Sequence, residues 1–324
     1  MDRKFLCMAA FAAMTLGLTS CSDDDDVEKA EEVVDFPVVG TINLSGAYNV
    51  YSHGAQGWIK EDKVGLFVLS DGVAQSNLSY ESSKVATAQT FPMGDVEMTM
   101  YDKPFVTEDT PLKPTSTEVA GFKKGEHTLY AYVPFNTASK DYTAVVLPNL
   151  TTQELYETEM PNMPNRKYGF DVASAKVSTF SSATVSLGEF EPLFSQITYP
   201  SPKFGMDFDG KKVSKVVVSC DKAIAYEEGA TINLATKEIK GTPVKEITMN
   251  LNDKTAKYNS RYDNVSLGTT LCFMVAVPFE TAKDYEFTFT FTVEGKEYAV
   301  KGKPNANGSK KNNLNMNGIP TVGE

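Results

Sequence analysis

Apolar and polar residues alternate along most of the chain after residue 35, with the period of two that is typical of half-buried β-strands. Residues 287–293 alternate Phe or Val with Thr, and the following Glu294-Gly295 separates them from a second strand-like run, which predicts a hairpin. Amphipathic helical patterns are weak, and the best candidate, residues 151–156, would form about one and a half turns. In residues 38–50 five large apolar side chains share one parity: Val38, Ile42, Leu44, Tyr48 and Val50. The pattern predicts an all-β protein.

One segment of the chain occurs twice. Residues 133–142 read VPFNTASKDY and residues 277–285 read VPFETAKDY, so that one deletion, at Ser139, and one substitution separate them. Each copy follows an apolar run and contains a proline, which lacks the N–H group that a strand ladder needs. We favour an internal duplication over convergent turn chemistry, and we expect both copies to form equivalent strand-turn-strand corners.

The length of 324 residues suggests two globular units. A strand-like segment near Phe170 would close the first unit, and residues 184–187 and 197–199 read as new strands beyond it. We therefore place the boundary near residue 180. The prediction is two tandem antiparallel β-sandwich domains, residues 36–180 and residues 181–324.

The N-terminus reads as a secretory signal peptide over residues 1–20, with basic residues followed by an apolar stretch from Phe5 to Leu18. This stretch is shorter than the roughly 18 apolar residues that a membrane-spanning helix needs. Residues 18–21, Leu-Thr-Ser-Cys, resemble a bacterial lipobox. The resemblance implies that Cys21 is the first mature residue and is acylated (palmitate and related chains), whereas an ordinary signal peptide with an incidental cysteine is the alternative.

Residues 21–35 form an acidic tether that begins Cys-Ser-Asp-Asp-Asp-Asp, and a block of like charges repels itself and stays extended. The tether would hold the folded body away from the lipid. It also resembles the export signal that directs lipoproteins of Bacteroides-type bacteria to the outer face of the outer membrane. Both interpretations stay open, because the same residues can serve both roles.

Charge and residue usage exclude several functional classes. The 31 basic and 42 acidic side chains give a net charge of −11, which argues against nucleic acid as a partner. The chain has no phosphate-binding glycine loop and no zinc-ligand spacing. Residues 207–210, Asp-Phe-Asp-Gly, resemble a calcium loop only weakly and are better explained as a turn. We expect no cofactor, no metal and no enzymatic activity, although 42 acidic residues leave a glycosidase-type carboxylate pair open.

Histidine and cysteine are scarce. His53 and His127 both lie beside turn-like residues, and we expect them to be solvated loop residues rather than catalytic groups. Cys220 and Cys272 are the cysteines left in the folded body once the leader and the lipidated residue are set aside. Since both lie in strand-like runs, we favour two buried free thiols over a disulfide.

Three features together resemble the Bacteroides-type fimbrillin family: the lipobox with its acidic run, residues 58–68 (WIKEDKVGLFV), and residues 131–135 (AYVPF). The resemblance covers residues 21–324. It implies two transthyretin-like sandwiches, a lipid-anchored lipoprotein on the cell surface at the outer membrane, and a pilin or accessory role in adhesive fimbriae. The implied partners are other fimbrial subunits, outer-membrane lipid through Cys21, and a host or bacterial surface receptor.

The chain departs from the family pattern in one respect. In polymerising members an arginine-directed protease removes the first strand and opens a groove, but here no arginine lies between Arg3 and Arg166. Lys29, Lys60 and Lys63 leave room for another protease, or the chain stays uncut as an anchor or accessory subunit.

Two functions from different classes follow. The first is a fimbrial subunit or anchor that assembles by β-strand exchange: residues 38–50 would be the exchanged strand, and the alternating C-terminal segment with Leu314, Met316 and Ile319 would be the donor strand. The second is a monomeric surface lipoprotein that binds glycan through exposed aromatic residues. Trp58 is the one tryptophan and precedes an apolar strand, so packing in the core or at a sheet edge explains it better than sugar stacking, which favours the first function.

Overall fold

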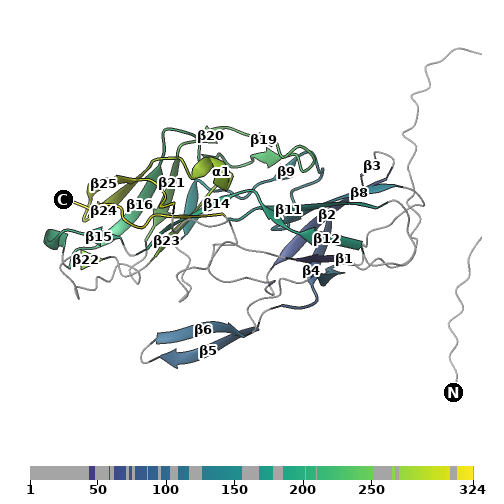
Figure 1. Cartoon of the computed structure of the whole chain (residues 1–324), viewed down its shortest axis with the longest axis horizontal. Helices are drawn as coiled ribbons and strands as arrows, with labels where there is room; N and C mark the ends of the chain where they lie inside the picture. The colour runs from purple at the N-terminus through teal and green to yellow at the C-terminus, as the bar shows by residue number, and fades with distance from the viewer. Residues whose placement is uncertain are drawn as a thin grey trace, which may run out of the picture. The chain divides into compact units, whose positions relative to one another are not determined.

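The structure is a computed structural model of the chain, shown in Figure 1. It describes residues 44–47, 58, 62–70, 73–74, 77–85, 87–93, 96–102, 109–116, 126–154, 168–177, 185–200, 202–208, 210–251, 265–266, 270–306 and 312–323. All of these residues belong to the compact unit formed by residues 36–324. The signal peptide, Cys21, the acidic tether and His53 lie outside the described residues, as do Val38, Ile42, Tyr48 and Val50 of the candidate exchanged strand.

The all-β prediction is confirmed. Within the described residues the helical elements are the four-residue α1 (Phe279–Ala282) and the 3-10 turn η1 (Met206–Phe208). In the same part of the chain, no helix has the length and apolar character that crossing a membrane requires.

Nine of the described strands form the largest sheet, which contains most of the strands from the first half of the chain (Figure 1). Its pairs are antiparallel except for β1 with β12, which run parallel. The strand order is β12 (Val185–Glu189), β1 (Leu44–Ala47), β7 (Thr110–Pro114), β4 (Leu78–Ser82), β2 (Lys63–Ser70), β8 (His127–Val133), β11 (Asp171–Val177) and β13 (Glu191–Pro192), with β3 (Val73–Ala74) pairing with β2.

Two further sheets contain most of the longer strands from the second half of the chain. The five-stranded sheet has the order β10 (Thr152–Glu154), β21 (Glu246–Asn250), β16 (Val213–Ser219), β24 (Phe287–Val293) and β25 (Lys296–Gly302). The three-stranded sheet has the order β23 (Leu271–Val275), β14 (Ser195–Tyr199) and β26 (Asn313–Asn315). The remaining strands form small sheets: β15 (Lys203–Phe204) with β22 (Val265–Ser266), β17 (Ala225–Tyr226) with β20 (Pro243–Val244), β18 (Thr231–Ile232) with β9 (Val145–Val146) and β19 (Ile239–Lys240), and β5 (Thr87–Met93) with β6 (Val96–Asp102).

The five-stranded and three-stranded sheets pack face to face through aromatic side chains. Phe289 of β24 lies edge-on to Tyr199 of β14, with ring centroids 4.8 Å apart, and Phe273 of β23 lies 6.3 Å from the same Phe289 ring. The apolar residues of β24 are buried whereas its threonines are half-buried, so the alternation read from the sequence separates the inner and outer faces. Burial against this core raises the pKa of the Tyr199 hydroxyl.

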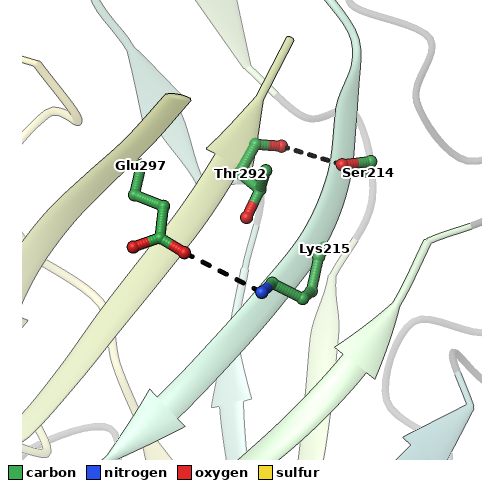
Figure 2. A network of polar contacts seen from close by, with 4 residues as sticks. All are labelled: Ser214, Lys215, Thr292 and Glu297. Carbon is green, nitrogen blue, oxygen red and sulfur yellow. Dashed lines mark hydrogen bonds and ion pairs between the residues drawn. The ribbon is translucent and has the colours of Figure 1, made fainter. Parts of the chain in front are cut away.

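The outer face of the five-stranded sheet is polar. The Lys215 ammonium of β16 lies 3.8 Å from the Glu297 carboxylate of β25, and Thr292 of β24 lies between them in the sheet. Figure 2 shows this ion pair. The hydroxyl of Ser214 donates a hydrogen bond to the Thr292 carbonyl oxygen over 3.4 Å. Both charged side chains are exposed, so the ion pair adds little stability and marks a surface that faces water.

The predicted hairpin is confirmed. β24 and β25 pair antiparallel over seven residues each, from Phe287 with Gly302 to Val293 with Lys296. The two connecting residues, Glu294 and Gly295, have φ values of 47° and 79°. A two-residue turn with both φ values positive matches the right-handed twist of the flanking strands, which is why a glycine follows the glutamate.

The prediction that the two VPF copies form equivalent corners is wrong. After β8 the first copy runs through turns, and the Asn136 side chain accepts a hydrogen bond from the Ala138 N–H, which holds the turn. The second copy forms α1, and Lys283, which caps the C-terminal end of this helix, pairs with Glu280 one turn earlier. The single substitution, asparagine to glutamate, replaces a turn-forming residue by a helix-compatible one.

Ser139, the residue that the second copy lacks, is fully buried in the first copy. Its hydroxyl accepts a hydrogen bond from the Val146 N–H over 3.0 Å, and its carbonyl oxygen accepts one from Asn77. The extra residue is therefore part of the turn that the first copy forms and contributes to the difference between the two copies.

Two smaller predictions are also wrong. Residues 152–154, within the best helix candidate among otherwise weak helical patterns, form strand β10, which pairs parallel with β21. His127 is not a solvated loop residue: it begins β8, is 3% exposed, and its Nδ1 lies 2.6 Å from the Ser70 hydroxyl. Both residues of that contact lie in register on adjacent strands, so pairing in the sheet, which the local turn signal does not reveal, places the histidine inside.

The division into residues 36–180 and 181–324 stays a prediction. Strands β12 and β13, which follow residue 180, lie in the nine-stranded sheet, and β14 is the first strand of the smaller sheets. Strands β9 and β10 of the first half pair instead with β18 and β21 of the second half. The chain thus changes sheets after Pro192, and two short strands cross between the halves.

Candidate strand-exchange site

Strand β1 lies inside the nine-stranded sheet although it comes first in the chain. Leu44 is opposite Val185 of β12 on one side and Leu112 of β7 on the other. All four residues of β1 are buried, and the Leu44 side chain is 0% exposed. Because β12 and β7 each pair with β1 and not with one another, removal of β1 would leave two facing rows of unpaired backbone groups and an apolar gap between them.

Trp58 fixes the position of β1. Its indole N–H donates a hydrogen bond to the Gly46 carbonyl oxygen over 3.2 Å, and its ring meets that of Phe190 edge-on at 5.5 Å. The Phe190 N–H in turn donates to the Ala47 carbonyl oxygen over 3.0 Å. Trp58 is fully buried, which confirms the prediction that it serves packing, and its place is in the core rather than at an exposed edge.

A side chain at the position of Gly46 would be tightly crowded. A Cβ atom built on Gly46 would lie 3.0 Å from the Phe190 ring and 3.6 Å from the Gly188 carbonyl oxygen. The Phe190 ring is fully buried and packs against Trp58, so it cannot move away cheaply. The site therefore selects a strand with glycine at this position.

The candidate donor strand is packed into the sheets of its own chain. Leu314 of β26 and the following Met316 are fully buried, and Ile319 is half-buried against Gly302. β26 pairs parallel with β14 over three residue pairs, and the Thr198 hydroxyl donates to the Asn313 side chain over 2.7 Å. β26 is a short strand at the edge of its sheet, so leaving that place would break few main-chain bonds.

A polar hollow of about 340 Å³ lies where β24 and β25 approach the loop around Lys222; it was not predicted from the sequence because its residues come from three separate segments. The Lys222 ammonium lies 4.6 Å above the centre of the Tyr285 ring. Burial, followed by the nearby Cys220 and Asp221, raises the pKa of Tyr285. The lining residues are Asp221, Lys222, Asp284, Tyr285, Glu286, Thr288, Lys301 and Lys303.

The described residues contain no group of three or more His, Cys, Asp or Glu side chains arranged to hold a metal ion. Carboxylates and ammonium groups are balanced in the hollow, which suits hydrogen bonding to a neutral polar ligand better than binding of a single ion. No residue in the hollow matches a candidate that the sequence patterns suggest.

Cys220 and Cys272 are both buried thiols outside any disulfide, which confirms the prediction of two buried thiols rather than a disulfide. Burial raises the pKa of the Cys272 thiol to about 11, and burial is also the main cause of the raised pKa of Cys220. Both groups are therefore protonated near neutral pH and behave as small apolar residues of the core.

A comparison with protein-family models finds no match, and no curated protein matches the chain. Solved structures with a similar fold include proteins of Bacteroides and Parabacteroides species. A "putative cell adhesion protein" of Bacteroides uniformis is 16% identical, with a TM-score of 0.49 over 89% of this chain and 90% of that chain. A protein of the same description from Bacteroides ovatus is 14% identical, with a TM-score of 0.41 over 81% and 85%. A fimbrial assembly protein of Parabacteroides distasonis is 10% identical, with a TM-score of 0.39 over 86% and 91%.

Proposed function

We propose that the chain is a non-enzymatic surface lipoprotein that serves as a fimbrial subunit, or as an anchor or accessory subunit, and assembles by β-strand exchange. The observation that carries this proposal is the position of β1, a short buried strand between two strands that do not pair with each other. A strand in that position can be replaced by an extended segment of another subunit, which would make the same main-chain hydrogen bonds. The resemblance of residues 58–68 and 131–135 to fimbrillins points to the same function.

The lipid anchor belongs to the same proposal. An acylated Cys21 would hold the protein to the outer membrane, because each buried methylene contributes about 0.8 kcal/mol and several chains on one residue add up. The acidic tether between Cys21 and the folded unit would let the unit reach other subunits and a host or bacterial receptor on the cell surface. Replacing Cys21 by Ala should leave the protein unprocessed or released, and normal membrane retention of that variant would argue against the anchor.

Strand exchange is tested by removing the exchanged strand. A soluble protein lacking residues 1–50 should form concentration-dependent or SDS-resistant oligomers, because the open gap accepts a strand from a neighbour. The matched control lacks residues 1–35 only and keeps β1, so it should remain monomeric in gel filtration. Removing residues 312–324 as well should abolish the oligomers. A strictly monomeric protein without residues 1–50 would contradict strand exchange.

The polar hollow favours the alternative function, a monomeric surface lipoprotein that binds glycan. Its carboxylates, lysines and Thr288 offer hydrogen bonds to sugar hydroxyls, and Tyr285 offers part of a ring face. However, the large apolar side chains that are exposed in the described part of the chain are Val73 and Val85, so this part presents no exposed aromatic platform. Saturable binding to a polysaccharide that is lost on Tyr285→Ala replacement would favour the alternative.

A further inference from the structure

The second copy of the repeated segment ends at the polar hollow. Its last two residues, Asp284 and Tyr285, line the hollow together with residues 221–222 after β16 and two lysines at the end of β25. The volume of about 340 Å³ suits a small polar ligand. None of the lining residues belongs to β1, β7 or β12, so the hollow is separate from the strand-exchange site.

Thr288 connects the hollow to the polar outer face of the five-stranded sheet. It lies opposite Lys301 of β25, and it shares its parity on β24 with Thr292, which places both threonines on the same face (Figure 2). At Thr292 the charges of Lys215 and Glu297 pair with each other across the strand. In the hollow, by contrast, no ion pair within the described residues joins two of the lining side chains. The charges of the hollow are therefore free to contact a ligand.

The hollow carries equal numbers of acidic and basic side chains: Asp221, Asp284, Glu286, Lys222, Lys301 and Lys303. A ligand with a net charge would face side chains of its own sign there. A sugar hydroxyl both donates and accepts, so it can donate to a carboxylate and accept from an ammonium group at the same time. The net charge of −11 also repels anionic glycans. This balance favours a neutral ligand that is rich in hydroxyl groups.

Tyr285 contributes its hydroxyl to the hollow more than its ring. The Lys222 ammonium covers one ring face at 4.6 Å, and the centre of the Phe287 ring lies 6.2 Å from that of Tyr285. In the part of the chain that the structure describes, the Tyr285 hydroxyl forms no hydrogen bond. Burial raises its pKa, so the hydroxyl is protonated near neutral pH and can donate to a ligand.

We propose that the hollow binds a neutral glycan through two adjacent hydroxyl groups of one sugar. The carboxylates accept hydrogen bonds from these hydroxyls, and Lys301, Thr288 and Tyr285 donate to their oxygens. The inference deepens the proposed function and rests on it for the location at the cell surface. It gives a fimbrial subunit a receptor site that is separate from the strand-exchange site, so that the same chain can assemble and bind glycan.

The test uses residues 22–324, which lack only the signal peptide and Cys21. Binding is measured by saturation-transfer difference NMR and by isothermal titration calorimetry. The neutral probes are the methyl glycosides of glucose, galactose and mannose, and the charged probes are glucuronic acid and glucosamine.

Two variants each remove one hydroxyl from the hollow, Tyr285→Phe and Thr288→Val. The matched control is Thr290→Val, which makes the same replacement two residues further along the same face of β24, outside the hollow. Circular dichroism establishes that all variants are folded.

We expect at least one neutral methyl glycoside to bind, and Tyr285→Phe and Thr288→Val each to weaken that binding roughly five- to tenfold, because each variant loses one hydrogen bond to the sugar. The Thr290→Val protein should bind like the unchanged chain. If no neutral glycoside binds, or if the control loses as much affinity as the two variants, the site is overturned. Tighter binding of glucuronic acid or glucosamine would overturn the neutral ligand class.

These results are independent of strand exchange. Oligomers that form after removal of residues 1–50 would support assembly even if no sugar binds. A monomeric protein in that experiment would contradict the proposed assembly, whereas sugar binding by residues 22–324 would still support the hollow as a glycan site.

Discussion

At the scale of single residues, the close packing around Gly65 explains why residues 58–68 contain a glycine at this position. Gly65 lies opposite Tyr132 in the pairing of β2 with β8, and a Cβ atom at position 65 would lie 2.0 Å from the Tyr132 ring. That ring is fully buried between Phe67 and Phe170, at centroid distances of 6.2 Å and 5.8 Å. The Tyr132 hydroxyl also accepts a hydrogen bond from the Asn77 amide, so both the ring and its hydroxyl are held by neighbouring side chains.

Gly65→Ala should therefore destabilise the protein by about 3 kcal/mol, because the ring cannot move aside and the core would be overpacked. Urea unfolding monitored by circular dichroism measures the change. Gly205→Ala is the matched control, since a Cβ atom at that position meets its nearest neighbours at 3.9 Å and should change stability little. Equal stabilities of the two variants would contradict this account of Gly65.

The thiol of Cys272 gives a prediction that depends on pH. Its pKa is raised to about 11 by burial, so the thiolate, the reactive form, is scarce at pH 8. We expect Ellman's reagent to react slowly with the folded protein at pH 8 and rapidly with both body cysteines after unfolding. The stabilisation from keeping this thiol neutral is complete below its pKa in the unfolded chain and is lost as the pH rises through about 11. Fast reaction of Cys272 in the folded protein at pH 8 would be inconsistent with its burial.

The burial of individual side chains was the feature that the sequence alone predicted least well. The apolar character of Trp58 and of the two cysteines was enough to place them inside, since burial follows from residue type. His127 was misplaced because its sequence neighbours are typical of a turn, whereas its position in the sheet depends on Ser70, which is 57 residues away. No local pattern contains that partner.

At the scale of secondary-structure elements, strand β10 shows how long-range contacts decide a short segment. The Gln153 side chain pairs with the backbone of Met274 in β23: its amide N–H donates to the Met274 carbonyl oxygen over 2.7 Å, and its carbonyl oxygen accepts from the Met274 N–H over 2.9 Å. Gln153 is 1% exposed. The glutamine thus takes the place of a neighbouring strand for one residue of β23.

Gln153→Leu should destabilise the protein by about 2–4 kcal/mol, because it leaves two buried backbone groups of Met274 without partners. Glu154→Ala is the control, since the Glu154 side chain is exposed on the same strand. Thermal unfolding followed by differential scanning calorimetry compares the two. A Gln153→Leu protein as stable as the control would show that the paired amide contributes no net stability.

Long alternating segments were predicted correctly, and short ones were not. β24 and β25 follow from the alternation of residues 287–293 and from the turn residues Glu294 and Gly295 between the two strands, because seven residues of strict period two fix both the strand and its inner face. β10 and α1 are three and four residues long, and their conformations depend on contacts with other segments rather than on local preference. The exchange site could be named only in part, because the pairing of β1 with both β7 and β12 is invisible in the pattern.

At the scale of the whole molecule, strand pairs and a shared apolar core join the two halves of the described chain. Strands β9 and β10 of the first half pair with β18 and β21 of the second. One continuous set of buried apolar side chains extends from Leu44 to Val322. A boundary drawn at residue 180 would also separate β12 from β1 and expose the Leu44 side chain, which is fully buried.

We therefore expect residues 36–324 to unfold in a single cooperative transition, because separating the halves would expose the strand pairs and the core that they share. Calorimetric and van't Hoff enthalpies should agree for this unit. Proteins cut at residue 180 should yield fragments that do not fold alone but recover native circular dichroism when mixed, because each fragment lacks strands that the other supplies. Two separate transitions, or two fragments that each fold independently, would instead support two autonomous domains with their boundary near residue 180.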